Sequence, residues 1–225
     1  SSNPTLTNNI FRYNTDGVDS DAGAIPKILN NTFLENVRPI SVHAQRIDST
    51  LYGNSYIDND KNYIEVQGDL IGEGRTIVWA MDGAPYMVNG DIYVRRTNNI
   101  NHISILKIEP GTEVWFGSGS DLFIGHESNG SYRGALQAEG VTFTRSQGNE
   151  TWPGIDIRNY AVDDYTYLNN CIIEYAEWGV YCESSNPTLT NNIFRYNNDG
   201  VEANSGSEPI ISNNNFLENN GGIVL

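Results

Sequence analysis

Carboxylates are the first side chains in this sequence that could do chemistry. In the stretch "DNDKN" the side-chain oxygens of Asp58 and Asp60 alternate along the chain, as they do in a calcium-binding loop. The stretch lacks the glycine and the distant glutamate of an EF-hand, so an exposed turn is the alternative interpretation. We expect no cofactor, with Asp58 and Asp60 as weak candidates for calcium.

Paired acids next to a basic residue would be needed for sugar chemistry. Two acids some 5–10 Å apart can hydrolyse a glycosidic bond, and Asp16 and Glu35 could meet this requirement on neighbouring segments. Accidental neighbours are expected among 28 acidic residues, however. Arg12 and Arg195 are copies of each other within a repeat, and repeated residues usually serve the scaffold. We therefore expect no catalytic residue.

Histidines and cysteines complete the reactive side chains. His43, His102 and His126 are scattered without the spacing of metal ligands. Cys171 and Cys182 are either two small buried apolar side chains or one disulfide. The sequence contains no G-x-S-x-G motif, P-loop or catalytic Cys–His signature.

Charge and aromatic content limit the partners. With 28 acidic and 13 basic residues the net charge is −15, which disfavours nucleic acid because phosphates would be repelled. The 13 Tyr and four Trp could stack on sugar rings or fill a core. No run of 18 apolar residues is present, so we expect no membrane span in this segment.

A short repeat determines where these residues lie. The phrase "SSNPTLTNNIFRYNTDGV" at Ser1 returns at Ser184, changed only where Thr15 becomes Asn198. Within it, the second Asn of each "NN" pair recurs every 22 or 23 residues. This Asn column is predicted to contain Asn9, Asn31, Asn54, Asn170, Asn192 and Asn214. Apolar columns are predicted to form a core stack of Leu6, Phe11, Phe33, Tyr56, Ile172, Leu189, Phe194 and Phe216.

Short strands explain this repeat better than helices do. The segments between the Asn anchors have no 3.6-residue apolar rhythm, and Asn and Gly stand in their middle. Stacking each turn of chain on the next places equivalent residues about 4.8 Å apart. Apolar columns then form continuous internal stacks, and the Asn columns form ladders in which each amide pairs with the next. The sequence therefore predicts an all-β, parallel β-solenoid.

The middle of the chain follows the same pattern with longer rungs. We expect one solenoid over residues 1–225, with about nine or ten coils and a junction between units near residues 66–86. Residues 1–41 match residues 184–224, which defines a long repeat of 183 residues. Loops are expected to project at Gly125–Tyr132 and Ser146–Thr151.

The rungs "PTLTNNIFRYNTDGV", "PKILNNTFLENVRPI", "PTLTNNIFRYNNDGV" and "PIISNNNFLENNGGI" resemble right-handed parallel β-helix repeat proteins of the pectin-lyase-like superfamily. The segment from Tyr86 to Ser146 is similar to the opening rungs of secreted or cell-surface proteins of this type. The resemblance implies a right-handed helix of three-sided coils. It does not select an activity, because this fold hosts lyases, hydrolases, epimerases, adhesins and inert stalks.

The first functional hypothesis is a non-catalytic structural module of an extended extracellular or cell-surface repeat protein, fibre or sheath. Its partners would be copies of itself, stacked head to tail or joined as tandem repeats. The alternative is a polysaccharide-binding adhesin, or an enzyme of the polysaccharide lyase, hydrolase or epimerase type. Because Ser1 already lies within a repeat, we expect the native gene product to begin elsewhere.

Overall fold

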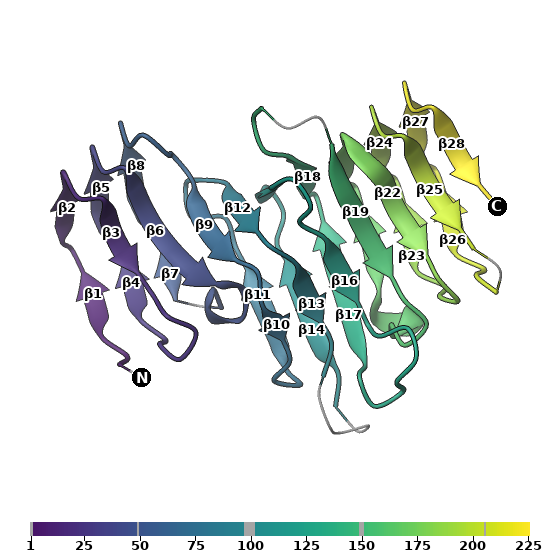
Figure 1. Ribbon diagram of the computed structural model, residues 1–225, viewed down its shortest axis with the longest axis horizontal. Coiled ribbons are helices and arrows are strands. Elements are labelled where there is room, and N and C mark those ends of the chain that lie inside the picture. The colour runs from purple at the N-terminus through teal and green to yellow at the C-terminus, as the bar shows by residue number, and fades with distance from the viewer. Residues whose placement is uncertain (1, 49, 97–101, 149–150, 205) are drawn as a thin grey trace.

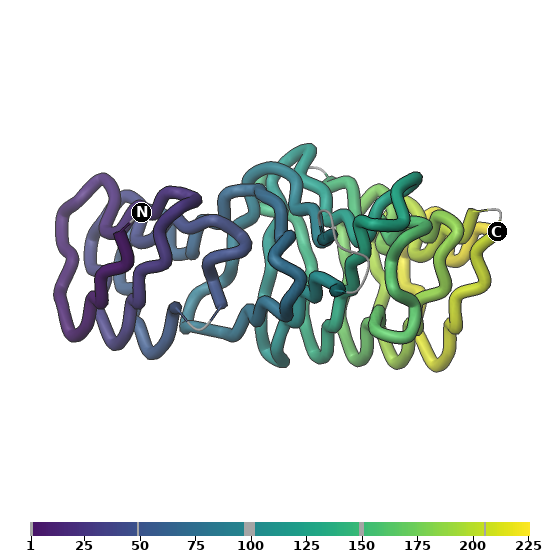
Figure 2. The backbone as a smooth tube through the Cα atoms, turned by 90° about the horizontal axis from the view of Figure 1, so that it is seen from below, coloured from purple at the N-terminus to yellow at the C-terminus, as the bar shows by residue number. Residues whose placement is uncertain are grey.

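Successive coils of the chain stack along one long axis, and the two termini lie at opposite ends of it (Figures 1 and 2). The computed structural model describes residues 2–48, 50–96, 102–148, 151–204 and 206–225. Strands pair in parallel with the equivalent strands of the coils before and after. The predicted all-β class and parallel solenoid are therefore confirmed.

One sheet of nine strands runs through the whole stack. In spatial order from the N-terminal end, its strands are β3 (Asp16–Asp19), β6 (Arg38–His43), β9 (Ile64–Gln67), β12 (Tyr86–Asn89), β15 (Glu113–Phe116), β18 (Thr142–Arg145), β21 (Ile172–Glu174), β24 (Ile193–Arg195) and β27 (Asn215–Leu217).

Two further sheets close the coils after residue 69. The seven-stranded sheet contains β10 (Leu70–Ile71), β13 (Ile92–Val94), β16 (Leu122–Ile124), β19 (Trp152–Ile157), β22 (Ala176–Cys182), β25 (Asp199–Ala203) and β28 (Gly221–Val224). The six-stranded sheet contains β11 (Thr76–Trp79), β14 (Ser104–Ile108), β17 (Gly134–Glu139), β20 (Tyr167–Asn169), β23 (Thr188–Thr190) and β26 (Ile210–Ser212).

The first three coils use two small sheets instead. One contains β1 (Thr5–Thr7), β4 (Lys27–Leu29) and β7 (Leu51–Tyr52), and the other contains β2 (Ile10–Arg12), β5 (Thr32–Leu34) and β8 (Ser55–Ile57). As a result, the two copies of the repeated phrase contribute different strands to the nine-stranded sheet. The N-terminal copy contributes its third strand, β3, whereas the C-terminal copy contributes its second strand, β24.

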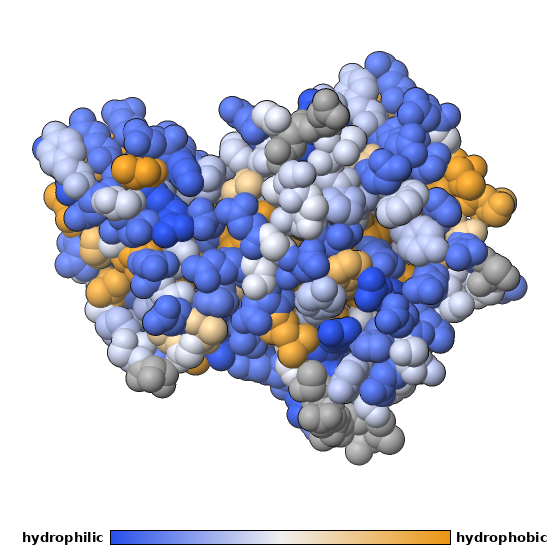
Figure 3. Space-filling model, viewed as in Figure 1, coloured by the Kyte–Doolittle hydropathy of each residue, from blue (hydrophilic) through white to orange (hydrophobic). Residues whose placement is uncertain are grey.

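Helical structure is limited to two short 3₁₀ turns, η1 (Ala44–Arg46) and η2 (Asp163–Tyr165), in the described part of the chain. Neither of them is long and apolar enough to cross a membrane. Most of the visible surface is hydrophilic, with scattered apolar patches (Figure 3).

Apolar side chains from equivalent strand positions stack into continuous columns inside the coils. The ring of Phe33 lies between those of Phe11 and Tyr56, with centroid distances of 5.0 and 5.6 Å. Phe194 stacks on Phe216 in the same way at 5.1 Å. Of the predicted core stack, Phe33, Leu189 and Phe194 are buried, while Leu6, Phe11, Tyr56 and Phe216 are half-buried and pack against the core.

Asparagine amides connect the coils at the corners. The backbone N–H of Asn9 donates to Oδ1 of Asn31 at 2.9 Å, and the N–H of Asn31 donates to Oδ1 of Asn54 at 2.9 Å. The amide Nδ2 of Asn31 and of Asn54 also donates to a backbone carbonyl of the preceding coil, so each amide satisfies groups on both sides. A second set of such bonds joins Asn14, Asn36 and Asn59.

This run of amides ends on a buried carboxylate. Asp82 accepts from the N–H and Nδ2 of Asn54, at 3.1 and 2.7 Å, and from the hydroxyl of Tyr56 at 2.8 Å. Burial raises the pKa of Asp82 although these donors oppose the shift. An aspartate suits this position because the final residue of the run needs only to accept hydrogen bonds.

In the C-terminal coils the predicted positions of two residues, Asn170 in the ladder and Ile172 in the core, are wrong. Cys171, not Asn170, occupies the ladder position, since the N–H of Cys171 donates to Oδ1 of Asn192 at 2.9 Å. Asn170 is exposed and has a φ of 54°, the left-handed corner conformation that Asn tolerates well. The core residue is likewise Ile173, which pairs with Phe194, and Ile172 is only half-buried. Asn192 does continue to Asn214, whose Oδ1 accepts its N–H at 2.7 Å.

Coil length varies along the stack. Equivalent residues are 22 or 23 apart in the first coils, 28 to 30 apart in the middle, and 21 or 22 apart near the C-terminus. The predicted loop Ser146–Thr151 includes Asn149 and Glu150, which lie outside the described residues.

Candidate functional site

The predicted calcium candidates lie at an exposed corner. Asp58 has a φ of 49°, and the backbone N–H of Asp60 donates to the carbonyl of Asn36 at 2.9 Å. Both side chains are exposed. Within the described ranges, no three His, Cys, Asp or Glu side chains come together in a way that could hold a metal ion.

The carboxylates and arginines of the repeated rungs form ion pairs between neighbouring coils. Glu35 accepts from Nε of Arg12 at 2.8 Å, and Arg195 donates to Glu174 in the C-terminal copy at 2.6 Å. Asp16 is 2.5 Å from Nε of Arg38. Asp16 and Glu35 are therefore engaged by different arginines, Arg38 and Arg12.

The thiols of Cys171 and Cys182 are both buried and free, so the disulfide alternative is wrong for this structure. Burial raises the pKa of Cys171 to about 11 and that of Cys182 to about 12. Thiols with such high pKa values are poor nucleophiles at neutral pH. They behave as small apolar side chains of the core.

His43 and His126 contact different groups of the protein. His43 is 3.3 Å from the carboxylate of Asp69, and Nδ1 of His126 accepts the backbone N–H groups of Ser128 and Asn129. His102 is exposed at the edge of a gap in the described chain.

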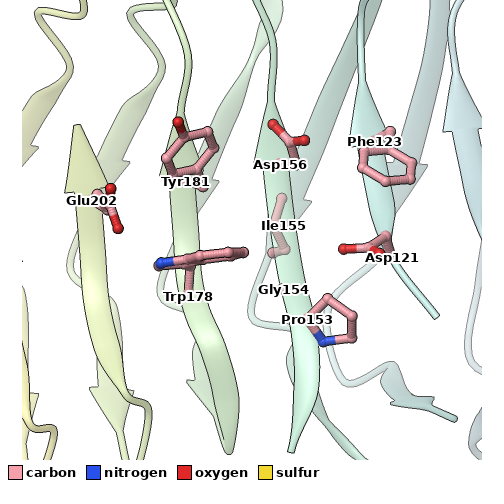
Figure 4. Close-up of a pocket in the computed structure, with 9 residues that line it drawn as sticks. All are labelled: Asp121, Phe123, Pro153, Gly154, Ile155, Asp156, Trp178, Tyr181 and Glu202. Atoms are coloured by element: carbon pink, nitrogen blue, oxygen red, sulfur yellow. The ribbon is translucent and has the colours of Figure 1, made fainter. Parts of the chain in front are cut away.

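A hollow that combines aromatic and acidic side chains lies on the outer face of the seven-stranded sheet, and we call it the aromatic–acid groove (Figure 4). Its volume is about 400 Å³, within the range of small-molecule sites. The groove is lined by Asp121, Phe123, Pro153, Gly154, Ile155, Asp156, Trp178, Tyr181 and Glu202.

Strand register arranges four of these side chains in one row. Phe123 pairs with Asp156, Asp156 pairs with Tyr181, and Tyr181 pairs with Glu202, on β16, β19, β22 and β25 in turn. Neighbouring strands lie about 4.8 Å apart, so the row spans about 15 Å along the solenoid axis. The groove therefore crosses four neighbouring strands and runs parallel to the long axis of the molecule.

A glycine bulge lets the backbone of Trp178 approach β19 closely. The register between β19 and β22 shifts at Gly154 and Ile155, and Gly154 has a φ of 137°. A Cβ at Gly154 would lie 1.9 Å from the carbonyl oxygen of Trp178, so only glycine fits there. In Figure 4 the indole extends from β22 toward Gly154, and its centroid is 5.5 Å from that of the Tyr181 ring.

Arg158 lies beside the groove and is already engaged. Its Nε donates to Oδ2 of Asp156 at 2.8 Å, and its guanidinium carbon is 3.9 Å from the centroid of the Phe123 ring. The other carboxylate oxygen, Oδ1 of Asp156, is buried and has no hydrogen-bond partner among the described residues.

Carboxylates crowd the same surface. Burial raises the pKa of Asp121 to about 7, and the nearby charges of Asp91 and Asp156 add to the shift while Arg158 opposes it. Asp91 itself accepts the backbone N–H of Asp121 at 3.1 Å. Burial also raises the pKa of Asp156, outweighing the effect of Arg158. A group with a pKa near 7 can carry or release a proton at neutral pH.

Asp121 is expected to make the stability of the protein fall as pH rises. Its folded-state pKa of about 7 lies above the ordinary aspartate value of 3.8, so between these pH values the folded chain holds a proton that the unfolded chain has released. This contribution is present below pH 3.8 and is lost as pH rises through 7. Thermal unfolding between about pH 4 and pH 8 should show a smaller fall in Tm for Asp121→Asn than for the wild type. Parallel curves for the two proteins would contradict the assignment.

A second, smaller hollow of about 350 Å³ lies on the outer face of the nine-stranded sheet. Tyr63, Met87 and Trp115 form its apolar part, with Lys61 at its rim. The indole Nε1 of Trp115 donates to Glu113 at 2.6 Å. This hollow lacks the row of alternating rings and acids, and Trp115 provides a matched control for Trp178.

Sequence reasoning did not identify the groove. In the sequence, Trp178 is one of four tryptophans and no motif marks Asp121. The groove residues come from coils of unequal length, so no fixed spacing connects them in the sequence. The available signal is weak: polar or aromatic residues alternate with buried ones along β16, β19 and β22.

Residues 92–225 match a protein family described as "Right handed beta helix region", and this match covers more than half of the chain and the entire groove. Comparison with curated proteins and with solved structures finds no match.

Proposed function

Because the chain belongs to the right-handed β-helix family, we propose that it is a rigid β-helical module that binds a glycan chain in the aromatic–acid groove. The module binds without turnover and forms part of an extended extracellular or cell-surface protein. Family membership supports the scaffold alone, since the same fold carries enzymes and non-enzymes. The choice of ligand rests on the groove.

The observation that carries this proposal is the row of alternating rings and acids along the solenoid axis. Tyr181 and Trp178 offer ring faces, which suit the apolar faces of sugar rings. Asp156 and Glu202 flank Tyr181 and provide acceptors for sugar hydroxyls. A groove that crosses several strands suits a polymer better than a single sugar.

The structural part of the proposal rests on the 183-residue repeat. Both copies of the repeated phrase form three strands joined by amide-bearing corners, β1 to β3 near one end and β23 to β25 near the other. A continuing solenoid of such units, or stacked copies of the chain, would extend the same columns. The acidic surface supports a partner other than nucleic acid.

Removal of the indole should weaken glycan binding. Trp178→Ala is expected to lower affinity at least tenfold for a glycan that the wild type selects from an array, because central aromatic contacts dominate such sites. Trp115→Ala, on the other sheet, should bind as the wild type does. Calorimetric titration of the three proteins measures both effects.

Three other outcomes would contradict different parts of this proposal. Equal binding by wild type and Trp178→Ala would place the ligand elsewhere, and absence of binding to any glycan would end the proposal. Release of reducing ends or unsaturated products from the bound glycan would instead favour the polysaccharide lyase or hydrolase alternative.

A further inference from the structure

The charge of the aromatic–acid groove restricts the kind of glycan that fits. All nine lining residues belong to the described part of the chain; three of them are carboxylates and none is basic. Asp91 adds a fourth carboxylate directly behind Asp121. A polymer of uronic acids would bring its own carboxylates against these groups, and the protein carries a net charge of −15.

The neighbouring arginine offsets only part of this charge. Arg158 donates to Asp156, and its guanidinium carbon is 3.9 Å from the centroid of the Phe123 ring, so its single charge faces several carboxylates. The free Oδ1 of Asp156 remains as a buried acceptor without a donor.

Carboxylate crowding gives a second reason for a cationic ligand. The pKa of Asp121 is raised in part by Asp91 and Asp156, which means that these negative charges repel one another in the folded protein. A positive charge placed between Asp121 and Asp156 would relieve this repulsion. Ring faces and carboxylates together match a sugar ring that carries an ammonium group.

We propose, on the basis of the proposed glycan-binding function, that the ligand is a polymer of free amino sugars. Its ammonium groups bind at Asp121, Asp156 and Glu202, while Trp178 and Tyr181 contact the faces of its rings. An acetylated amino group has no positive charge, so the acetylated polymer binds more weakly. Uronic acid polymers are excluded by repulsion.

Three oligosaccharides of equal length test this proposal: hexamers of glucosamine, N-acetylglucosamine and galacturonic acid. Titration at pH 7, where about half of Asp121 is ionised before the ligand binds, is expected to give at least tenfold tighter binding of the glucosamine hexamer than of the acetylated one, and no binding of the galacturonate hexamer. The preference should shrink at high salt, because it depends on charge.

Two conservative variants test whether the carboxylates of the groove bind the ammonium groups. Asp121→Asn and Glu202→Gln should each lower affinity for the glucosamine hexamer severalfold and leave affinity for the acetylated hexamer unchanged. Glu139→Gln removes one exposed charge at the end of β17, on the six-stranded sheet, and should change neither affinity. Thermal unfolding of each variant verifies that the fold is retained.

The failures of the two proposals are distinguishable. If the acetylated or galacturonate hexamer binds best and Trp178→Ala abolishes that binding, the glycan function stands and the amino-sugar inference is overturned. If glucosamine binding is equally weakened by Glu139→Gln, the attraction is to net charge and the inference is also overturned. If no hexamer binds, both proposals fail.

Discussion

Phe33→Ala is expected to lower the free energy of unfolding by about 3–5 kcal/mol, the usual cost of emptying a buried phenylalanine site. Phe33 is fully buried, and its ring is stacked between those of Phe11 and Tyr56. The coils above and below are held apart by strand pairing on both sides, so they cannot close around the cavity. Urea unfolding followed by circular dichroism measures the change.

Tyr52 provides the control for this experiment. It lies on β7 of the same N-terminal coils but is 71% exposed, so Tyr52→Ala should change stability by less than about 0.5 kcal/mol. A cost below about 1 kcal/mol for Phe33→Ala would show that the column does not hold these coils together.

Asn192→Leu is expected to lower the free energy of unfolding by about 2–4 kcal/mol. The leucine would leave two buried partners unpaired, the N–H of Cys171 and the carbonyl of Leu168, each at about 1–3 kcal/mol. The added apolar side chain offsets part of this cost. The N–H of Asn192 donates to Asn214 through the backbone and survives the substitution.

The same replacement at Asn215 separates the ladder from a general effect of leucine. Asn215 is exposed on β27, so Asn215→Leu should stay within about 0.5 kcal/mol of the wild type. If both variants lose the same stability in urea unfolding, the amide of Asn192 has no special role.

The repeated coils could be predicted because their side chains recur in columns. Asn31 and Phe33 mark one coil, and the same residue types recur in the coils on either side. The prediction was wrong at one coil, where "NNCII" offers two alignments that differ by one residue. Anchoring on Asn170 selected Ile172, whereas the structure uses Cys171 and Ile173. A small buried thiol in the ladder position gives no signal in the sequence.

The groove could not be predicted for a different physical reason. Asp156, Tyr181 and Glu202 become neighbours only through strand pairing across coils of unequal length. The raised pKa of Asp121 depends on its burial and on Asp91 and Asp156, which are far from it in sequence. Such properties exist only after the register of the sheet is known.

The change of sheet between the two copies of the repeated phrase has a consequence for any longer assembly. Each coil has three sides, and the second copy has advanced by one side relative to the nine-stranded sheet. The corner itself stays in place, because the ladder from Asn9 ends on Asp82, between β11 and β12, and Asn192 lies between β23 and β24 of the same two sheets. In a polypeptide that continues the 183-residue period, the ladder would therefore keep to one corner, and successive grooves would face the same side of the rod.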